Sequence, residues 1–217
     1  MLPFGIFTLG AVLVVAKARE VVPLRVMTYN AWNFDDGPLW ESRKRKISQV
    51  VRASIVDIVA WQELRIRPGT AKGMMDDLEE LLPEFPYTLF ESASANANHG
   101  EGVGLSSRFP ISRHEFLPLE LGTGTDRNQR KALYAALKVP SGELGVVVAH
   151  ISYDKNQQVM QAMELAEIMS ARPAPQILMG DRAWKCCFCF CFCFCFCFCY
   201  CYCYCYCYCY CIVLSLW

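Results

Sequence analysis

The stretch at residues 59–63, Val-Ala-Trp-Gln-Glu, ends an apolar run in a carboxylate. A buried strand has this pattern where it stops at the edge of a sheet and presents its last side chain to a cleft. A carboxylate on a rigid strand end is a hard oxygen ligand, which suits Mg²⁺ or Mn²⁺ beside a phosphate. We therefore interpret Glu63 as a metal ligand. The alternative is an exposed loop carboxylate, since loops commonly carry charge.

Three further strand-like segments also end in polar residues: Asn30, His150 and Asp181. Strand ends that converge on one rim are how α/β sheets build their sites. The sequence therefore predicts that these three side chains lie at the same rim as Glu63.

Apolar periodicity indicates the elements that must position this rim. It marks helices at residues 40–54, 70–82 and 157–169, and the basic run at 43–46 is interpreted as a solvated helix face. Strand-like segments alternate with these helices or form hairpins, and they lie at residues 23–29, 57–63, 87–90, 102–111 (a strand that runs into a turn at Phe109-Pro110), 114–120, 131–139, 144–150 and 176–180. This order predicts an α/β (α+β) fold in which mixed β-sheets are flanked by helices.

The composition bounds the class of protein. The 217 residues are enough for one domain with a real core, and their formal net charge is zero. A neutral chain has no overall field that would draw it to nucleic acid or to an acidic membrane. All 14 cysteines lie between Cys186 and Cys211, so the first 185 residues are typical of a globular sequence without disulfides.

The first 18 residues predict a secretory signal peptide. Residues 2–16 are almost wholly apolar, and Ala16-Lys17-Ala18 fits the small-x-small cleavage pattern, although no Lys or Arg precedes the run. We therefore expect a secreted protein. The alternatives are a membrane-anchored protein that retains this segment and a first buried strand.

Five short stretches form an ordered set between residues 24 and 181. They are Met-Thr-Tyr-Asn at 27–30, Trp-Gln-Glu at 61–63, Leu-Ser-Ser-Arg-Phe-Pro-Ile at 105–111, Val-Ala-His at 148–150 and, as a partial match, Leu-Met-Gly-Asp at 178–181. Together they resemble the endonuclease/exonuclease/phosphatase superfamily, on its deoxyribonuclease and neutral sphingomyelinase side. The resemblance implies a four-layer α/β sandwich and Mg²⁺- or Mn²⁺-dependent hydrolysis of a phosphodiester.

The resemblance also implies a role for each strand-end residue. Glu63 would bind the divalent cation, and Asn30 would hold the metal shell or a phosphate oxygen. His150 would contact the scissile phosphate and assist the leaving group, whereas Asp181 would position or polarise the attacking water. Arg130 resembles a phosphate-contacting arginine of some members.

Structural alternatives stay open for several of these residues. The alternative for Asn30 is a cap on the following turn, because Asn is a preferred turn residue, and the alternative for His150 is a hydrogen-bonded structural role. A surface loop position is the alternative for Arg130. His99 and His114 have no motif around them and are interpreted as surface residues.

The family pattern breaks after Asp181. Arg182 and Ala183 stand where an apolar residue and an asparagine would follow, and no histidine occurs after His150. We therefore expect a C-terminally truncated or mis-spliced domain, an incomplete sandwich over residues 24–181. Such a chain lacks its catalytic base and is expected to be inactive.

Residues 186–217 are dominated by Cys alternating first with Phe and then with Tyr. Because the codons for these residues differ at single bases, we interpret this low-complexity tail as an artefactual, translated simple repeat. The alternatives are an extended strand with every cysteine on one face and a membrane segment. A Zn site fits less well, because its ligands come in pairs separated by loops.

Two functions from different classes follow. The first is a metal-dependent phosphodiester hydrolase, inactive in this chain, whose partner is a phosphodiester substrate such as a nucleic acid or the phospholipid head group of sphingomyelin. The second is a non-catalytic secreted binding protein that retains the fold and the metal site. No basic stripe favours nucleic acid, and no obligate protein partner is inferred.

Overall fold

The computed structural model describes residues 23–33, 39–93, 100–173, 175–182 and 209–211. The predicted signal peptide, His99 and most of the Cys-rich tail lie outside these residues. Within the described part of the chain, no helix is long and apolar enough to cross a membrane.

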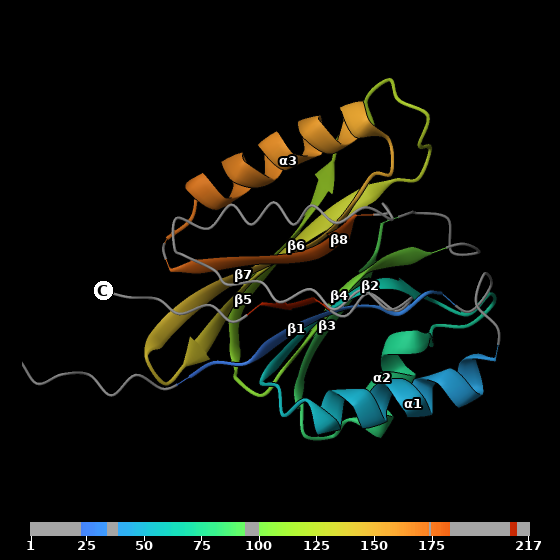
Figure 1. Ribbon diagram of the computed structural model, residues 1–217, viewed down its shortest axis with the longest axis vertical. Coiled ribbons are helices and arrows are strands. Elements are labelled where there is room, and N and C mark those ends of the chain that lie inside the picture. The colour runs from blue at the N-terminus through green and yellow to red at the C-terminus, as the bar shows by residue number, and fades with distance from the viewer. Residues whose placement is uncertain (1–22, 34–38, 94–99, 174, 183–208, 212–217) are drawn as a thin grey trace, which may run out of the picture.

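Two β-sheets pack against each other between layers of helices (Figure 1). The first sheet has the order β3-β4-β2-β1-β9 and the second the order β5-β6-β7-β8. The strands are β1 (Val26–Asn30), β2 (Ile58–Arg65), β3 (Tyr87–Ser92), β4 (Glu101–Ser107), β5 (Ile111–Leu119), β6 (Arg130–Val139), β7 (Gly142–Ile151), β8 (Gln176–Arg182) and β9 (Cys209–Cys211). The pairs β1–β2 and β7–β8 are parallel and the other pairs antiparallel, so both sheets are mixed.

Three helices of the described part of the chain cover the outer faces of the sheets. Helices α1 (Trp40–Ala53) and α2 (Met74–Leu81) lie on the first sheet, and α3 (Lys155–Ser170) lies on the second (Figure 1). The predicted class, mixed sheets flanked by helices in a sandwich, is therefore confirmed. The part of the prediction that concerns truncation stays a prediction.

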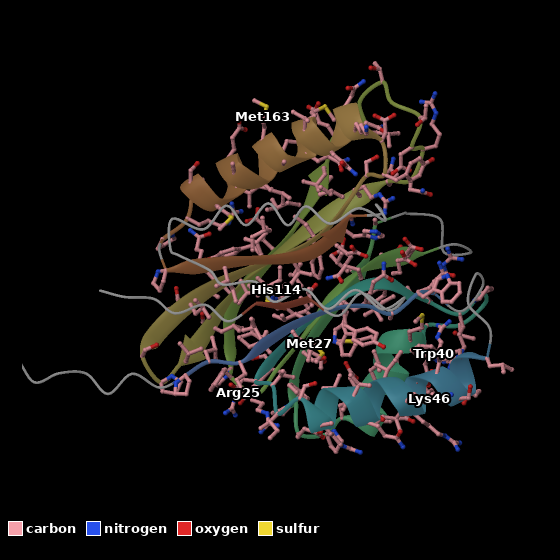
Figure 2. All side chains as sticks on the ribbon, viewed as in Figure 1. Arg25, Met27, Trp40, Lys46, His114 and Met163 are labelled. Atoms are coloured by element: carbon pink, nitrogen blue, oxygen red, sulfur yellow. The ribbon has the colours of Figure 1, made fainter. Side chains whose placement is uncertain are left out.

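The period-two alternation of β2 divides the core into layers. Ile58 and Ala60 pack between the two sheets with residues of β6 and β7, whereas Val59 and Trp61 pack toward α1 and α2. Met27 and Trp40 belong to this helix-side layer (Figure 2). Because β2 is buried on both faces, its sequence is a continuous apolar run, and this run is the pattern from which the strand was predicted.

Several predicted boundaries differ from the structure; the strand predicted to end at Glu63, for example, continues to Arg65. The helix expected from residue 70 begins at Met74, because the hydroxyl of Thr70 bonds the carbonyls of Arg67 and Lys72 and closes a turn there. The turn predicted at Phe109-Pro110 lies between β4, which ends at Ser107, and β5, which begins at Ile111 rather than at His114. The Ser107 hydroxyl accepts the backbone N–H of Phe109 at 2.9 Å and so stabilises the turn between them.

Candidate active site

Asn30, Glu63 and Asp181 meet at the rim where β1, β2 and β8 end. The Nδ2 of Asn30 donates to Oε1 of Glu63 at 2.7 Å and to Oδ2 of Asp181 at 2.9 Å. The Oδ1 of Asn30 accepts the backbone N–H of Trp32 at 2.8 Å. Asn30 therefore shapes the turn after β1 and also bridges two carboxylates.

Glu63 reaches the rim because β2 contains a bulge. The register between β2 and β4 shifts between Trp61 and Leu64, and Glu63 has a φ of 56°. Strict alternation would place Trp61 and Leu64 on opposite faces, yet both pack in the helix-side layer. Because of the bulge, the side chain of Glu63 does not lie on the face that alternation would assign to it. It lies at the rim instead, and its backbone has a conformation that is rare outside glycine.

Asp181 is placed by the close approach of β8 to β7. In this parallel pair, Asp181 lies in register with His150. A Cβ atom at Gly180 would lie only 2.2 Å from the carbonyl oxygen of Ala149, which is too close for any residue except glycine. The glycine before Asp181 is therefore a geometric requirement of the site.

His150 is buried beside a guanidinium. Its Nδ1 lies 3.1 Å from Nη1 of Arg130, and its side chain is 6% exposed. Because arginine only donates hydrogen bonds, Nδ1 accepts, and the neutral ring carries its proton on Nε2. Among the described residues Nε2 has no hydrogen-bond partner, and it lies 3.9 Å from Oε1 of Glu63.

Burial sets the protonation of this histidine. Loss of water around the ring, together with the charge of Arg130, lowers the pKa of His150 from 6.5 to about 3, although Asp126 acts in the opposite direction. His150 is therefore neutral at physiological pH. Its Nε2–H is a hydrogen-bond donor directed toward the rim.

Arg130 is held by a buried carboxylate, so the surface alternative for Arg130 was wrong. Its Nη2 donates to Oδ2 of Asp126 at 2.8 Å. Burial alone would raise the pKa of Asp126, but hydrogen bonds from Arg130 and from the backbone of Asn128 outweigh it and lower the pKa. The backbone of Asp126 is fixed in turn by Gln157 of α3, which accepts the Asp126 N–H at 3.2 Å and donates to its carbonyl at 3.1 Å.

Glu101, at the first position of β4, also belongs to the site. Its Oε1 lies 3.9 Å from Nδ1 of His150 and 4.0 Å from Nη1 of Arg130. Its Oε2 accepts Nδ2 of Asn33 at 2.9 Å. Sequence reasoning missed both Glu101 and Asp126. The only signal for Glu101 was a charge at the start of an apolar strand, and Asp126 had none.

The residues at the rim fit a hard divalent cation. Burial raises the pKa of Glu63, and the nearby carboxylates of Glu101 and Asp181 raise it further against the effect of the Asn30 hydrogen bond. A cation would relieve this repulsion. The part of the chain that the structure describes holds no group of three or more His, Cys, Asp or Glu side chains arranged as metal ligands. Mg²⁺, however, commonly takes only one or two carboxylates and completes its shell with water and phosphate oxygens.

The five residues predicted from the sequence thus come together at one rim: Asn30, Glu63, Arg130, His150 and Asp181. His114 lies exposed on β5, as expected. What the geometry adds is an order along the rim, from the carboxylates at Asn30 to the guanidinium of Arg130, with His150 between them.

Comparisons with known proteins identify relatives of this fold. The sequence model of the Endonuclease/Exonuclease/phosphatase family matches residues 27–181. An endonuclease/exonuclease/phosphatase from Beutenbergia cavernae is 26% identical with a TM-score of 0.57, and the match covers 71% of this chain and 46% of that one. Sphingomyelinase C from Streptomyces griseocarneus is 22% identical with a TM-score of 0.60, over 75% of this chain and 64% of that one.

A third structure, a mannosyl-6-phosphatase from Bacteroides thetaiotaomicron, is 21% identical with a TM-score of 0.59, over 73% of this chain and 64% of that one. The chain therefore spans about half to two thirds of the length of these solved proteins. No curated protein sequence matches it significantly. Because the family model matches well over half of its residues, the chain belongs to the endonuclease/exonuclease/phosphatase family, a family of phosphodiesterase- and phosphatase-like hydrolases.

Proposed function

We propose that this rim binds Mg²⁺ or Mn²⁺ together with the phosphate of a phosphoester, and that its chemistry is metal-assisted hydrolysis. The observation that carries the proposal is the Asn30 amide, whose Nδ2 joins the carboxylates of Glu63 and Asp181. These two partly buried carboxylates share a neutral donor, which does not offset their negative charge. A divalent cation is the natural partner for such a pair.

The other end of the rim is suited to an anion. Arg130 supplies a permanent positive charge, which it shares with the carboxylates of Asp126 and Glu101. The Nε2–H of His150 supplies a donor without a partner among the described residues. Both groups are buried, where electrostatic interactions are stronger than in water. With its lowered pKa, His150 would hold a phosphate oxygen as a neutral hydrogen-bond donor rather than as an imidazolium acid.

The residues at the carboxylate end of the rim each have a defined task in this proposal. Glu63 and Asp181 supply hard oxygen ligands, and Asn30 keeps both carboxylates at the rim. Asp181 also accepts a hydrogen bond from the attacking water and orients it. A bound cation would offset the charge that develops on the phosphate and would favour ionisation of that water.

Electrostatics favour a small phosphoester or a phospholipid head group over nucleic acid as the substrate. The formal net charge is zero, whereas nucleic-acid binding draws most of its affinity from phosphate contacts by clustered Lys and Arg. The likeness to a sphingomyelinase and to a sugar phosphatase concerns the fold. It agrees both with a small phosphoester and with a phospholipid head group as the substrate.

A second candidate function is binding without turnover. The 217 residues contain no histidine after His150, and the other two, His99 and His114, have no motif around them that marks a general base. On this basis we expect hydrolysis by the chain to be slow or absent, while cation and phosphate still bind at the rim.

One set of measurements separates the two functions. The full chain would be titrated with Mn²⁺ and with orthophosphate by calorimetry. It would also be assayed with Mg²⁺ on bis(4-nitrophenyl) phosphate, sphingomyelin and DNA. Turnover that Glu63→Ala abolishes supports the hydrolase, and binding of Mn²⁺ and orthophosphate without turnover supports the binding protein. If neither Mn²⁺ nor orthophosphate binds, both functions are wrong.

A further inference from the structure

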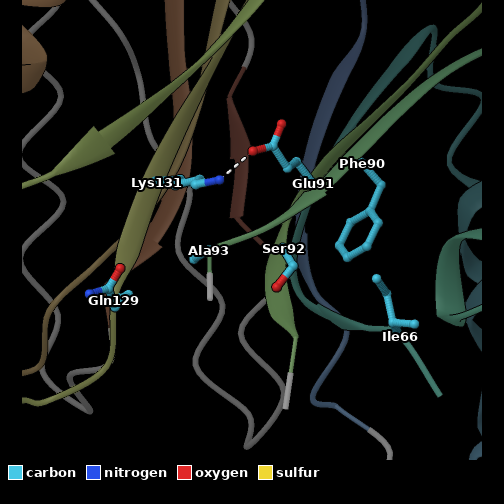
Figure 3. Close-up of a pocket in the computed structure, with 7 residues that line it drawn as sticks. All are labelled: Ile66, Phe90, Glu91, Ser92, Ala93, Gln129 and Lys131. Atoms are coloured by element: carbon cyan, nitrogen blue, oxygen red, sulfur yellow. Dashed lines mark hydrogen bonds and ion pairs between the residues drawn. The ribbon is translucent and has the colours of Figure 1, made fainter. Parts of the chain in front are cut away.

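A pocket of about 510 Å³ opens between the ends of β2 and β3 and the start of β6 (Figure 3). Its walls include Phe90 and Glu91 of β3 and Lys131 of β6, together with Ile66, which follows β2, and Gln129, which precedes β6. This volume lies within the range of small-molecule sites, which run from roughly 300 to 1,000 Å³. None of these five residues belongs to the rim described above.

The pocket adjoins the anion-binding end of the rim. Gln129 and Lys131 also line a second, much smaller cavity, whose other walls include Arg130 and His150. A phosphate held by Arg130 and His150 would therefore have this pocket beside it. The group that the pocket would receive is the one esterified to that phosphate.

The charge of the pocket favours an uncharged group. The ammonium of Lys131 forms an ion pair with the carboxylate of Glu91 across the two sheets (Figure 3). The two formal charges cancel inside the pocket. A ligand cation would have to compete with Lys131 for the carboxylate of Glu91. A ligand anion would have to compete with Glu91 for the ammonium of Lys131.

The other walls favour a ligand with hydroxyl groups. Phe90 and Ile66 form an apolar side, which suits the C–H face of a ring. The exposed carboxamide of Gln129 offers both donors and an acceptor, and Glu91 and Lys131 add further acceptors and donors. A hydroxyl group is itself donor and acceptor, so it can bond to each of these groups.

We propose that this pocket binds the uncharged, hydroxyl-rich ring of a phosphoester, such as the hexose ring of a sugar phosphate. The inference rests on the proposed function, because it takes the phosphate to lie at Arg130 and His150. It narrows the substrate class to polyol phosphates and disfavours head groups that carry a quaternary ammonium.

Calorimetric titration with three probes tests the proposal: glucose 6-phosphate, phosphocholine and inorganic phosphate. Glucose 6-phosphate should bind about 10-fold more tightly than either of the others, the gain expected from one or two additional hydrogen bonds. Gln129→Ala should reduce this preference, because it should lower the affinity for glucose 6-phosphate more than that for inorganic phosphate. Gln49→Ala, which truncates an exposed glutamine on α1, is the matched control and should preserve the preference.

The outcomes distinguish this inference from the proposed function. Equal affinity for the three probes, or tighter binding of phosphocholine, would overturn the sugar pocket while the phosphate site stands. If inorganic phosphate does not bind, the proposed function fails. In that case the pocket is tested by NMR titration with uncharged methyl α-D-glucopyranoside. Saturable chemical-shift changes that Gln129→Ala abolishes would support a sugar site, and the absence of saturable changes would overturn it.

Discussion

Asn30 and Asp181 lie 151 positions apart in the chain, and Nδ2 of the first donates to Oδ2 of the second at 2.9 Å. Asn30 ends a strand of the first sheet and Asp181 lies in an edge strand of the second. Because the same Nδ2 also donates to Glu63, one amide joins both sheets at the rim. The side-chain cluster therefore depends on the packing of the two sheets as well as on the individual strands.

Replacement of Glu63 by glutamine should weaken cation binding while preserving the fold. Glutamine keeps the shape of the side chain but removes one of two anionic ligands, so the dissociation constant for Mn²⁺ should rise by at least about 10-fold. The metal-free variant should melt at a higher temperature than the wild type, because repulsion with Asp181 and Glu101 is relieved. Calorimetry and thermal denaturation measure the two effects. Glu143→Gln, in an exposed hairpin, is the control, and unchanged Mn²⁺ affinity in Glu63→Gln would contradict the assignment.

Gly180→Ala should destabilise the protein and displace Asp181. The added methyl would lie 2.2 Å from the carbonyl oxygen of Ala149, a backbone atom that can move only if β8 separates from β7. Gly145→Ala in the same strand pair is the matched control, since its nearest neighbour is the flexible side chain of Gln176. Urea denaturation should show the larger loss for Gly180→Ala, and its Mn²⁺ affinity should fall as well. Equal losses for the two variants would show that the close approach is unimportant.

Much of the fold could be predicted from the sequence because its elements have strong periodicity. The buried strand over β2 and the amphipathic pattern of α1 are local properties, and both elements formed where expected. Boundaries were less predictable. At Thr70 a single hydroxyl stabilises a turn, and an apolar pattern does not report such a bond.

The site could be predicted only in part. Asn30 is the last residue of β1 and His150 the next-to-last residue of β7, so their convergence follows from topology. Glu101 and Asp126 contribute through contacts with residues distant in sequence, and no local pattern marks them. The bulge that directs Glu63 was equally hidden, because it depends on the register between β2 and β4.

Asp126→Asn should destabilise the protein strongly, because Asp126 and Arg130 form a buried ion pair at 2.8 Å. Removal of one partner from such a pair typically costs about 3–5 kcal/mol of the free energy of unfolding, since the other charge stays buried without compensation. Urea denaturation checks this value. Arg113→Gln, which removes an exposed pair with Glu143, should change the denaturation midpoint far less. A similar small change in Asp126→Asn would show that Arg130 needs no such partner.

His150 should remain neutral, with its proton on Nε2, well into the acid range. Burial and the charge of Arg130 lower its pKa to about 3, whereas in the unfolded chain the ring takes up a proton near its ordinary value of 6.5. The unfolded state therefore binds more protons between these two values, so this residue's contribution to stability is complete above pH 6.5 and is lost as the pH falls toward 3. The free energy of unfolding, measured by urea denaturation at each pH, should rise with pH in this interval. The contribution of His150 to that slope is at most about 1.4 kcal/mol per pH unit, and it should be lost in His150→Gln.

NMR can test the protonation state directly, because the chain contains only three histidines. The ring ¹⁵N signals of His150, assigned by their loss in His150→Gln, should report a protonated Nε2 and an unprotonated Nδ1. These signals should stay constant from about pH 8 to about pH 5, the interval in which an unperturbed histidine changes charge. A ring that titrates within this interval, or that carries its proton on Nδ1, would contradict the contact with Arg130 and with it the role of Nε2–H as the donor at the rim.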